Sequence, residues 1–299
     1  MKKVIAALLV FALSYSAVIV YQQQIMKSSM SPIHLNFLAY VVASVILVLG
    51  IGLFSKKDLT GHSAPGIKYG VLTGFTASVI GDIAAMAGLR FSSSMNWGLL
   101  SRLSLPVTFL LAVVFLHEKA TKHKLAAVLV ALLGVFLVVY RWGSVVVLNR
   151  GDLFFFVAVL GFSIGNILSK KAMNYVSSLQ LSLYRIVSAA IMLSFFVFFF
   201  YPIQSSINWV AVVIVGSSFV LGIVLVNYII KQAGVSFFAV GSTLVPVFVM
   251  IFSVLFMHEQ PRAMQLLGGV LIISSILLFE KKSFLKLIKK EAFHDPSSV

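Results

Sequence analysis

Three charged residues lie inside long apolar stretches of this sequence: Asp82, Arg102 and Arg185. A charge removed from water is costly unless another charge, a polar group or a ligand stabilises it. A carboxyl group in such surroundings can carry a proton, and a guanidinium can hold an anionic group. These residue types therefore indicate the binding of an ionic solute or a proton rather than covalent catalysis, and we assign no catalytic residues.

Asp82 and Arg102 are spaced evenly about Ser92, ten residues before it and ten after it. If the chain turns near Ser92, two antiparallel helices rising about 1.5 Å per residue place the two charges at a similar depth. The spacing predicts an Asp82–Arg102 ion pair. Such a pair is either a permanent structural feature or part of a site for a substrate or a proton.

Arg185 and two asparagines fall in other apolar stretches. Arg185 can capture an anion in a cavity, or its long side chain can extend to the membrane surface. Asn166 and Asn227 can contact a solute, although polar side chains of membrane helices usually bond neighbouring helices. We retain all three as candidate substrate-binding or coupling residues.

Two prolines occupy corresponding places in two apolar stretches, Pro106 after Leu105 and Pro246 after Val245. A proline inside a helix lacks an N–H and clashes with the carbonyl four residues earlier, which here belongs to Arg102 or Ser242. In a membrane, such a carbonyl must be satisfied by a neighbour, water or a solute. We expect both prolines to break their helices near the membrane midplane, either at a binding site that includes Ser242 or only for packing.

The composition indicates that lipid surrounds most of the chain. Of its 299 residues 60% are hydrophobic and only 10% are charged, and the mean hydropathy is +1.07, whereas a soluble protein has about a quarter charged. The net charge of +15 falls in short clusters between apolar runs, unlike the continuous basic face of a nucleic-acid-binding protein. Cysteine is absent, which excludes disulfides and thiolate sites, and no metal or cofactor motif is present.

About 20 apolar residues in a helix cross a bilayer, and the sequence contains ten such stretches. We therefore predict an all-α polytopic membrane protein. The expected spans are residues 4–24, 33–54, 67–89, 97–116, 125–142, 153–169, 179–201, 209–230, 236–257 and 264–279.

The distribution of basic residues predicts the orientation. Of the 23 Lys and Arg residues, 16 lie on the side of the N-terminus, five lie on the other side, and Arg102 and Arg185 lie inside spans. Because basic loops stay in the cytoplasm, we expect both termini to be cytoplasmic in a bacterial or archaeal plasma membrane. Residues 282–299 form a basic cytoplasmic tail in this interpretation.

The two halves of the chain repeat one pattern. Each has a proline in its fourth span, followed by His117-Glu118 or His258-Glu259, a polar turn and an almost purely apolar helix. Neither His-Glu pair has the spacing of a zinc site, and we interpret both as helix-end caps and anchors. Five is an odd number of spans, so the second copy must enter the membrane from the opposite side. Spans five and ten are so apolar that we expect them at the periphery.

This repeated order resembles the drug/metabolite transporter superfamily, and within it the EamA-type transporters. The resemblance implies a ten-helix carrier with a central cavity between two inverted five-helix repeats, residues 1–146 and 150–281. The sequence departs from an exact repeat in two ways. Arg185 in the second half corresponds to Tyr40 in the first, and Asp82 and Arg102 occur only in the first half.

The resemblance implies an alternating-access secondary transporter of a small metabolite, such as an amino acid or a similar polar solute, most simply an exporter. The alternatives are uptake or exchange of a nucleobase, sugar or phosphorylated metabolite, or a passive channel. Expected partners are the small-molecule substrate, the lipid bilayer, and H⁺ or a counter-solute. No cofactor, metal or nucleic acid is expected. The cargo, the direction of transport and the oligomeric state stay open.

Overall fold

The computed structural model describes residues 2–26, 31–55, 58, 60–92, 97, 100–139, 150–200, 207–257 and 263–279. The basic tail expected at 282–299 and the second His-Glu pair, at 258–259, lie outside these residues. The described chain is helical throughout apart from short turns.

In the part of the chain that the structure describes, the helices form ten rods that coincide with the ten predicted spans to within a few residues. Their bounds are α1 (Lys2–Met26), α2 (Pro32–Phe54), α3 (Ala64–Thr73) with η2 (Gly74–Asp82) and α4 (Ile83–Phe91), η3 (Ser101–Leu103) with α6 (Ser104–Leu116), α7 (Lys122–Val139), α8 (Arg150–Ala172), α9 (Ser178–Phe200), α10 (Trp209–Ala233), α11 (Val235–Gly241) with α12 (Leu244–Met257), and α13 (Ala263–Phe279). Six rods are by themselves long and apolar enough to cross a membrane, and most of the others consist of shorter apolar helices. The predicted all-α membrane fold is confirmed.

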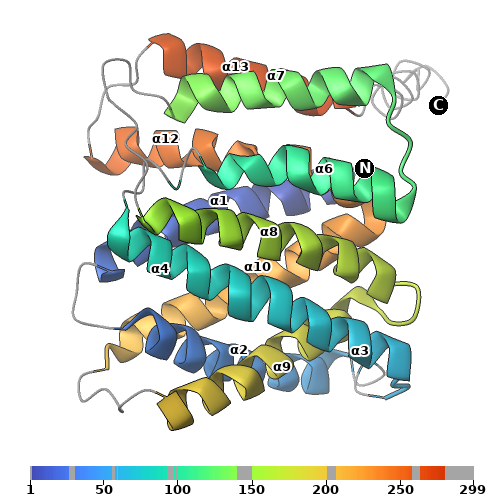
Figure 1. Ribbon diagram of the computed structural model, residues 1–299, viewed down its shortest axis with the longest axis vertical. Helices are drawn as coiled ribbons and strands as arrows, with labels where there is room; N and C mark the ends of the chain where they lie inside the picture. The colour runs from blue at the N-terminus through green and yellow to red at the C-terminus, as the bar shows by residue number, and fades with distance from the viewer. Residues whose placement is uncertain are drawn as a thin grey trace, which may run out of the picture.

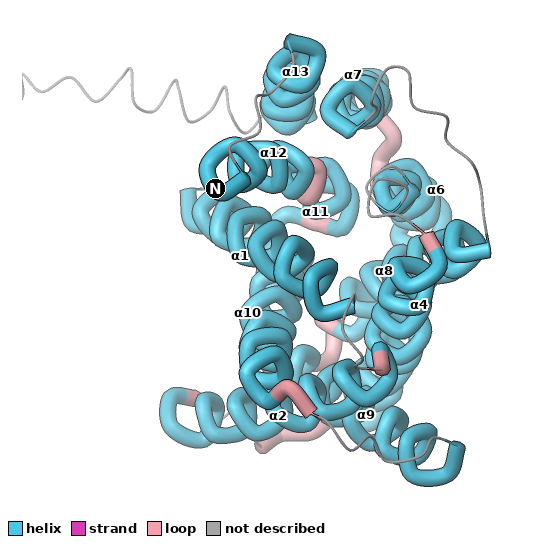
Figure 2. Tube along the Cα trace, turned by 90° about the vertical axis from the view of Figure 1, so that its left-hand side faces the viewer, coloured by secondary structure: helices cyan, strands magenta, loops and turns pink. Residues whose placement is uncertain are grey.

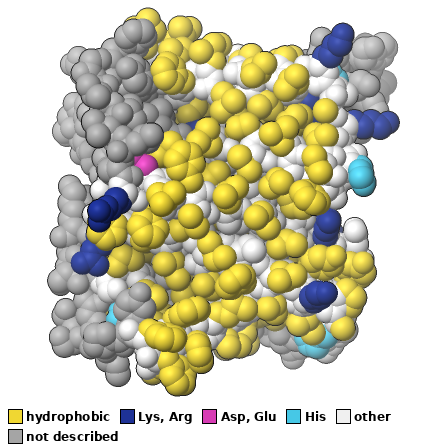
Figure 3. Space-filling view, viewed as in Figure 1, with side chains coloured by type: hydrophobic (Ala, Val, Ile, Leu, Met, Phe, Trp, Pro, Cys, Tyr) yellow, Lys and Arg dark blue, Asp and Glu magenta, His cyan; other side chains and the backbone are white. Residues whose placement is uncertain are grey.

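The outer surface is suited to lipid. The rods lie side by side (Figure 1), and hydrophobic side chains cover the middle of the face in Figure 3, with most basic side chains toward the two ends of the rods. Large apolar residues point outward along these rods; for example, Leu53 is 75% exposed and Phe199 is 71% exposed. In water such a surface would aggregate, whereas in a bilayer it is the solvated surface.

The two halves interleave with the symmetry of an inverted repeat. Helix α1 packs on α10 and α12 of the second half, while its counterpart α8 packs on the third span and on α6 of the first. Ser16 and Ser163 are equivalent residues of the two halves, because Ser16 lies ten residues before Met26 and Ser163 lies ten residues before the matching Met173. Ser16 donates to the carbonyl of Val245 at 3.0 Å, and Ser163 accepts from the Thr108 hydroxyl at 3.0 Å. Each half therefore inserts its first helix against the proline-containing span of the other.

Helix α8 lies between the third and fourth spans. The small residues Gly161 and Gly165 bring it against η2: a Cβ added at Gly161 would lie 2.6 Å from the Thr76 carbonyl oxygen, and one at Gly165 would lie 2.6 Å from the Ala77 Cβ. Its other side packs on α6. The third and fourth spans, although consecutive in the chain, are therefore separated in space by a helix of the other half.

Helices α7 and α13 lie side by side at one edge of the molecule, at the top of Figure 1. A Cβ added at Gly134 would lie 2.8 Å from the carbonyl oxygen of Gly268, so the two backbones are in close contact. This pair is the fifth and tenth spans, which were expected at the periphery.

Three spans depart from regular α-helix. The third span is π-helical from Gly74 to Asp82, the fourth contains the 3₁₀ turn Ser101–Leu103, and the ninth is interrupted by a turn at residues 242–243. The last two departures lie just before Pro106 and Pro246, at corresponding places of the two halves. π-Helical segments and broken membrane helices both occur frequently at functional sites.

Candidate functional site

A cavity of about 180 Å³ lies between the two halves. Its walls come from α1, the third span and the fourth span of the first half, and from α8, α10 and the ninth span of the second, with single residues from α2 and α9. In the end-on view of Figure 2, α1 and α10 face α4 and α8 across the centre of the molecule. Asp82, Arg102, Asn166, Arg185 and Ser242 all line this cavity. The structure thus brings together five of the six polar residues named from the sequence.

Asp82 ends the π-helical segment and is bonded to a tyrosine of α2. The Tyr40 hydroxyl, which is fully buried, donates to Asp82 Oδ2 at 2.5 Å. The Tyr40 ring is held in turn by Phe219 of α10, with the ring centroids 4.6 Å apart. A tyrosine fixed in this way supplies a hydrogen bond to the carboxyl group without needing to reorient.

Arg185 approaches the same segment from α9. Its Nε donates to the Ser78 hydroxyl at 3.0 Å, and its side chain is only 7% exposed. Ser78 precedes Asp82 by four residues, so Arg185 is bonded one helical turn away from Asp82 and, among the described residues, forms no direct ion pair with it. Tyr40 and Arg185, the corresponding residues of the two repeats, therefore converge on one segment of the third span.

Arg102 lies on another wall of the cavity. Its Nη1 donates to the backbone carbonyl of Ser242 at 3.3 Å, and that carbonyl also accepts the Val245 N–H at 3.1 Å. The carbonyl is available because Pro246 has no N–H to complete the helical bond. The Nε of Arg102 is buried and has no hydrogen-bond partner among the described residues.

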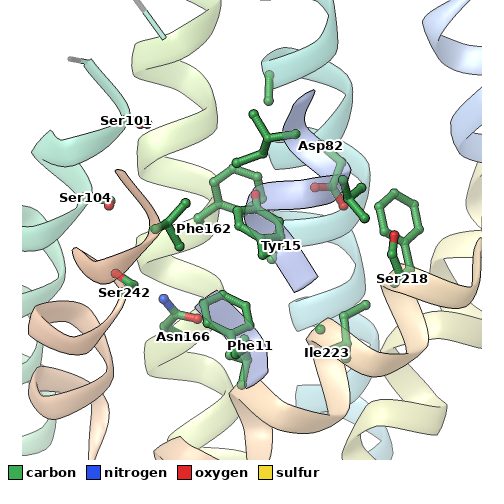
Figure 4. Close-up of a pocket in the computed structure, with 18 of the residues that line it drawn as sticks. Phe11, Tyr15, Asp82, Ser101, Ser104, Phe162, Asn166, Ser218, Ile223 and Ser242 are labelled. Carbon is green, nitrogen blue, oxygen red and sulfur yellow. The ribbon is translucent and has the colours of Figure 1, made fainter. Parts of the chain in front are cut away.

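The predicted ion pair between Asp82 and Arg102 is wrong. Asp82 bonds Tyr40, Arg102 bonds Ser242, and neither forms an ion pair with any described residue. The prediction assumed that spans three and four are neighbours, but α8 lies between them. Figure 4 shows Asp82 at one end of the cavity and Ser242 at the other, with Tyr15 and Phe162 between them.

Asn227 is the predicted site residue that the structure does not bring to the cavity. It is fully buried, and its Nδ2 donates to the Ser182 hydroxyl at 2.9 Å, which joins α10 to α9. Pro106 and Pro246 do not line the cavity either. Their preceding residues lie close to it, since Val245 is part of the cavity wall and Leu105 is buried in the core. Asn166 is partly exposed and its amide points into the cavity (Figure 4).

The remaining walls are largely aromatic. Phe11 and Tyr15 of α1 stack with ring centroids 5.3 Å apart, and Phe11 meets the edge of Phe238 at 5.4 Å. Phe162, Phe219 and Trp97 complete this lining. The site therefore combines a few buried charges with an apolar surface, as pockets for small organic molecules commonly do.

The cavity is closed toward the N-terminal end of α1. Its lining runs along α1 from Phe11 to Gln22 and includes no residue before Phe11. On the closed side, Leu8 fills the space in front of Gly241, where an added Cβ would lie 2.7 Å from a Leu8 methyl carbon. Lys170 donates to the Ile230 carbonyl at 3.2 Å nearby.

Glu118 of the first His-Glu pair also lies on this closed side. His117 ends α6 in the left-handed conformation (φ 53°), and the Glu118 carboxylate accepts the Val235 N–H at 3.3 Å. Glu118 thus caps the first turn of α11 in the opposite half. The interpretation of this pair as a helix-end cap agrees with the geometry, but the capped helix belongs to the other repeat.

Tyr40 is the functional candidate that sequence reasoning missed. Tyrosines in apolar helices are common, and the signal lay only in its correspondence with Arg185. Corresponding positions of an inverted repeat can meet near the pseudo-twofold axis, so this correspondence could have identified both residues.

Comparisons with known proteins agree with the duplicated architecture. The sequence pattern of the EamA-like transporter family matches residues 2–140 and again residues 149–280. A protein of Bacillus subtilis (strain 168) described as "Uncharacterized transporter YyaM" is 27% identical over 252 residues, which cover 80% of each chain. A solved structure described as "Crystal structure of protein" has a TM-score of 0.74 and covers 93% of this chain and 96% of its own, at 17% identity, so it supports the fold alone. Because one family pattern matches each half of the chain, the protein belongs to the EamA-like transporter family of the drug/metabolite transporter superfamily, and it is a membrane transporter rather than an enzyme.

Proposed function

We propose that this protein is a secondary transporter that exports a small polar metabolite, such as an amino acid or a similar solute, by alternating access. In this proposal the halves, residues 1–146 and 150–281, rock about the central cavity, and both termini lie in the cytoplasm. H⁺ or a counter-solute supplies the driving force.

The observation that carries the proposal is the cavity itself. It is built from both halves, it contains the charged residues Asp82, Arg102 and Arg185, and it is closed toward the N-terminal end of α1. Discontinuous helices of inverted-repeat transporters form their substrate sites near the midplane, and the breaks before Pro106 and Pro246 occur beside this cavity. A carrier that works by alternating access must be closed at one end while it is open at the other, which agrees with the contact of Leu8 and Gly241.

The test is transport by the purified protein in proteoliposomes, against a panel of amino acids, purines and sugar phosphates. A carrier shows saturable uptake that is accelerated when the same solute is loaded on the opposite side. Flux that rises linearly with concentration and shows no such acceleration would mean that the protein is a channel. Empty liposomes, and liposomes with the protein inserted in each orientation, give the background and the direction.

A further inference from the structure

Arg102 and Ser242 are equivalent residues of the two repeats, because each lies four positions before the proline of its span. The side chain of one bonds the backbone of the other. A contact between equivalent positions of an inverted repeat lies near the pseudo-twofold axis, midway between the two halves. A solute that binds at this point touches both halves at once, which is what an alternating-access site requires.

The guanidinium of Arg102 has donors to spare. Among the described residues it makes one hydrogen bond, at 3.3 Å, to a carbonyl that Val245 already satisfies in part, and its buried Nε has no partner there. The neighbouring Ser101 hydroxyl oxygen is likewise buried, with no hydrogen-bond partner in the described part of the chain. A buried donor or acceptor without a hydrogen bond costs free energy, and a ligand that bonds it removes this cost.

The charge of Arg102 is also uncompensated. Asp82 accepts from Tyr40, and Arg185 donates to Ser78 one helical turn before Asp82, so the acid among the described lining residues belongs to the other wall. The hydrogen bond of the Arg102 side chain goes to the neutral Ser242 carbonyl, and no described carboxylate pairs with it. The described walls of the cavity therefore carry one excess positive charge, located at the contact between the two halves.

We propose, on the basis of the transport function above, that the cargo is a small organic anion whose oxyanion group binds the Arg102 guanidinium. A carboxylate or a phosphate oxygen accepts hydrogen bonds from the guanidinium, including the N–H that now donates weakly to the Ser242 carbonyl. Asn166 lines the same cavity and can contact the anionic head group. The apolar body of the cargo packs against the aromatic wall formed by Phe11, Tyr15 and Phe238. When the cargo binds Arg102, it replaces the Arg102–Ser242 hydrogen bond that joins the two halves. Cargo binding and movement of the halves are therefore coupled.

The probes are 3-phenylpropionate, phenyl phosphate and the uncharged 3-phenylpropanamide. Binding to the purified full-length protein is read from the fluorescence of Trp97, which lines the cavity, with Trp97→Phe as the blank. We expect both anions, or one of them, to bind about 10- to 100-fold more tightly than the amide, as charge-assisted hydrogen bonds allow. Preference between the two anions distinguishes a carboxylate cargo from a phosphorylated one.

Arg102→Gln is expected to abolish the preference for anions, and Arg102→Lys to retain part of it, because lysine keeps the charge without the planar fork. Lys68→Gln, which removes an exposed charge of α3 away from the cavity, is the matched control and should bind like the wild type. If Arg102→Gln does not fold, the lysine variant still gives the comparison. Equal binding of the anions and the amide by the wild type would overturn the proposal, and so would an anion preference that survives in Arg102→Gln.

Transport separates this inference from the function on which it rests. Saturable transport of neutral or cationic solutes alone, not inhibited by 3-phenylpropionate or phenyl phosphate, would refute the anionic cargo and leave the carrier function intact. Absence of saturable transport for every panel solute would refute the carrier function, whatever the binding measurements show.

Discussion

Replacing Tyr40 with phenylalanine removes one hydroxyl oxygen and leaves the ring in place. The ring is fully buried against Phe219, and the hydroxyl donates to Asp82 at 2.5 Å. Hydrogen bonds to charged groups contribute about 1.5–3 kcal/mol, and an unmade bond in a buried site costs the full desolvation of the acceptor. We therefore expect Tyr40→Phe to lower the free energy of unfolding by about 1.5–3 kcal/mol.

Tyr15→Phe is the matched control. Tyr15 lines the same cavity and stacks on Phe11, but its hydroxyl makes no hydrogen bond with the described residues. Because no bond is lost, this variant should change stability by less than about 0.5 kcal/mol. The comparison separates loss of a specific bond from loss of a cavity-lining hydroxyl.

The assay is reversible unfolding in mixed detergent and dodecyl sulfate micelles, repeated in an Asp82→Asn background. There the Tyr40 hydroxyl donates to a neutral amide oxygen, whose net contribution is only about 0.5–1.5 kcal/mol, so the cost of Tyr40→Phe should fall by about half. The reasoning fails if Tyr40→Phe is as stable as Tyr15→Phe. It also fails if the Asp82→Asn background leaves the cost unchanged.

Three further predictions follow from packing, capping and charge. Gly134→Ala should destabilise the purified protein by about 1–3 kcal/mol because its Cβ would meet the Gly268 carbonyl of α13, whereas Gly50→Ala, with open space around it, should be neutral or stabilising in the same unfolding measurement. Glu118→Ala should raise the hydrogen-exchange rate of the α11 amides about fivefold, as expected for the loss of a cap worth about 1 kcal/mol. Glu118→Gln keeps a hydrogen-bond acceptor and should have a smaller effect. Equal exchange rates in the two variants would exclude the cap. Reporter fusions after residue 120 should read cytoplasmic and those after residue 146 external, and the same result at both would contradict the orientation.

The spans could be predicted from sequence because lipid imposes a simple rule on this chain. Every apolar stretch long enough to cross the bilayer becomes a helix, since a backbone in hydrocarbon has no other way to satisfy its polar groups. The repeat was equally visible, because Pro106 and Pro246 recur in the same order of elements. The hydropathy of the third span gave no sign of its π-helical segment, which packs closely against Gly161 and Gly165 of α8.

The partners of the charged residues could not be derived in the same way. Equal depth of Asp82 and Arg102 was a sound argument about distance along the membrane normal, but it contained no information on which helices are neighbours. The interleaving of the halves puts α8 between them and brings α2 and α9 to Asp82 instead. The prediction that Asn227 belongs to the site failed for a related reason. The sequence shows that a residue is polar, but it does not show which face of its helix lines the cavity.

The central claim, that cargo passes through the cavity between the halves, is tested most directly by one modification. Ser242→Cys introduces a single thiol into a chain without cysteine, at a partly exposed position of the cavity wall. We predict that a small water-soluble methanethiosulfonate reacts with it, that the reaction stops transport of whichever panel solute the wild type carries, and that this solute slows the reaction. Asn227→Cys, fully buried between α9 and α10, should stay unmodified. Full transport after complete modification of Ser242→Cys would contradict the account.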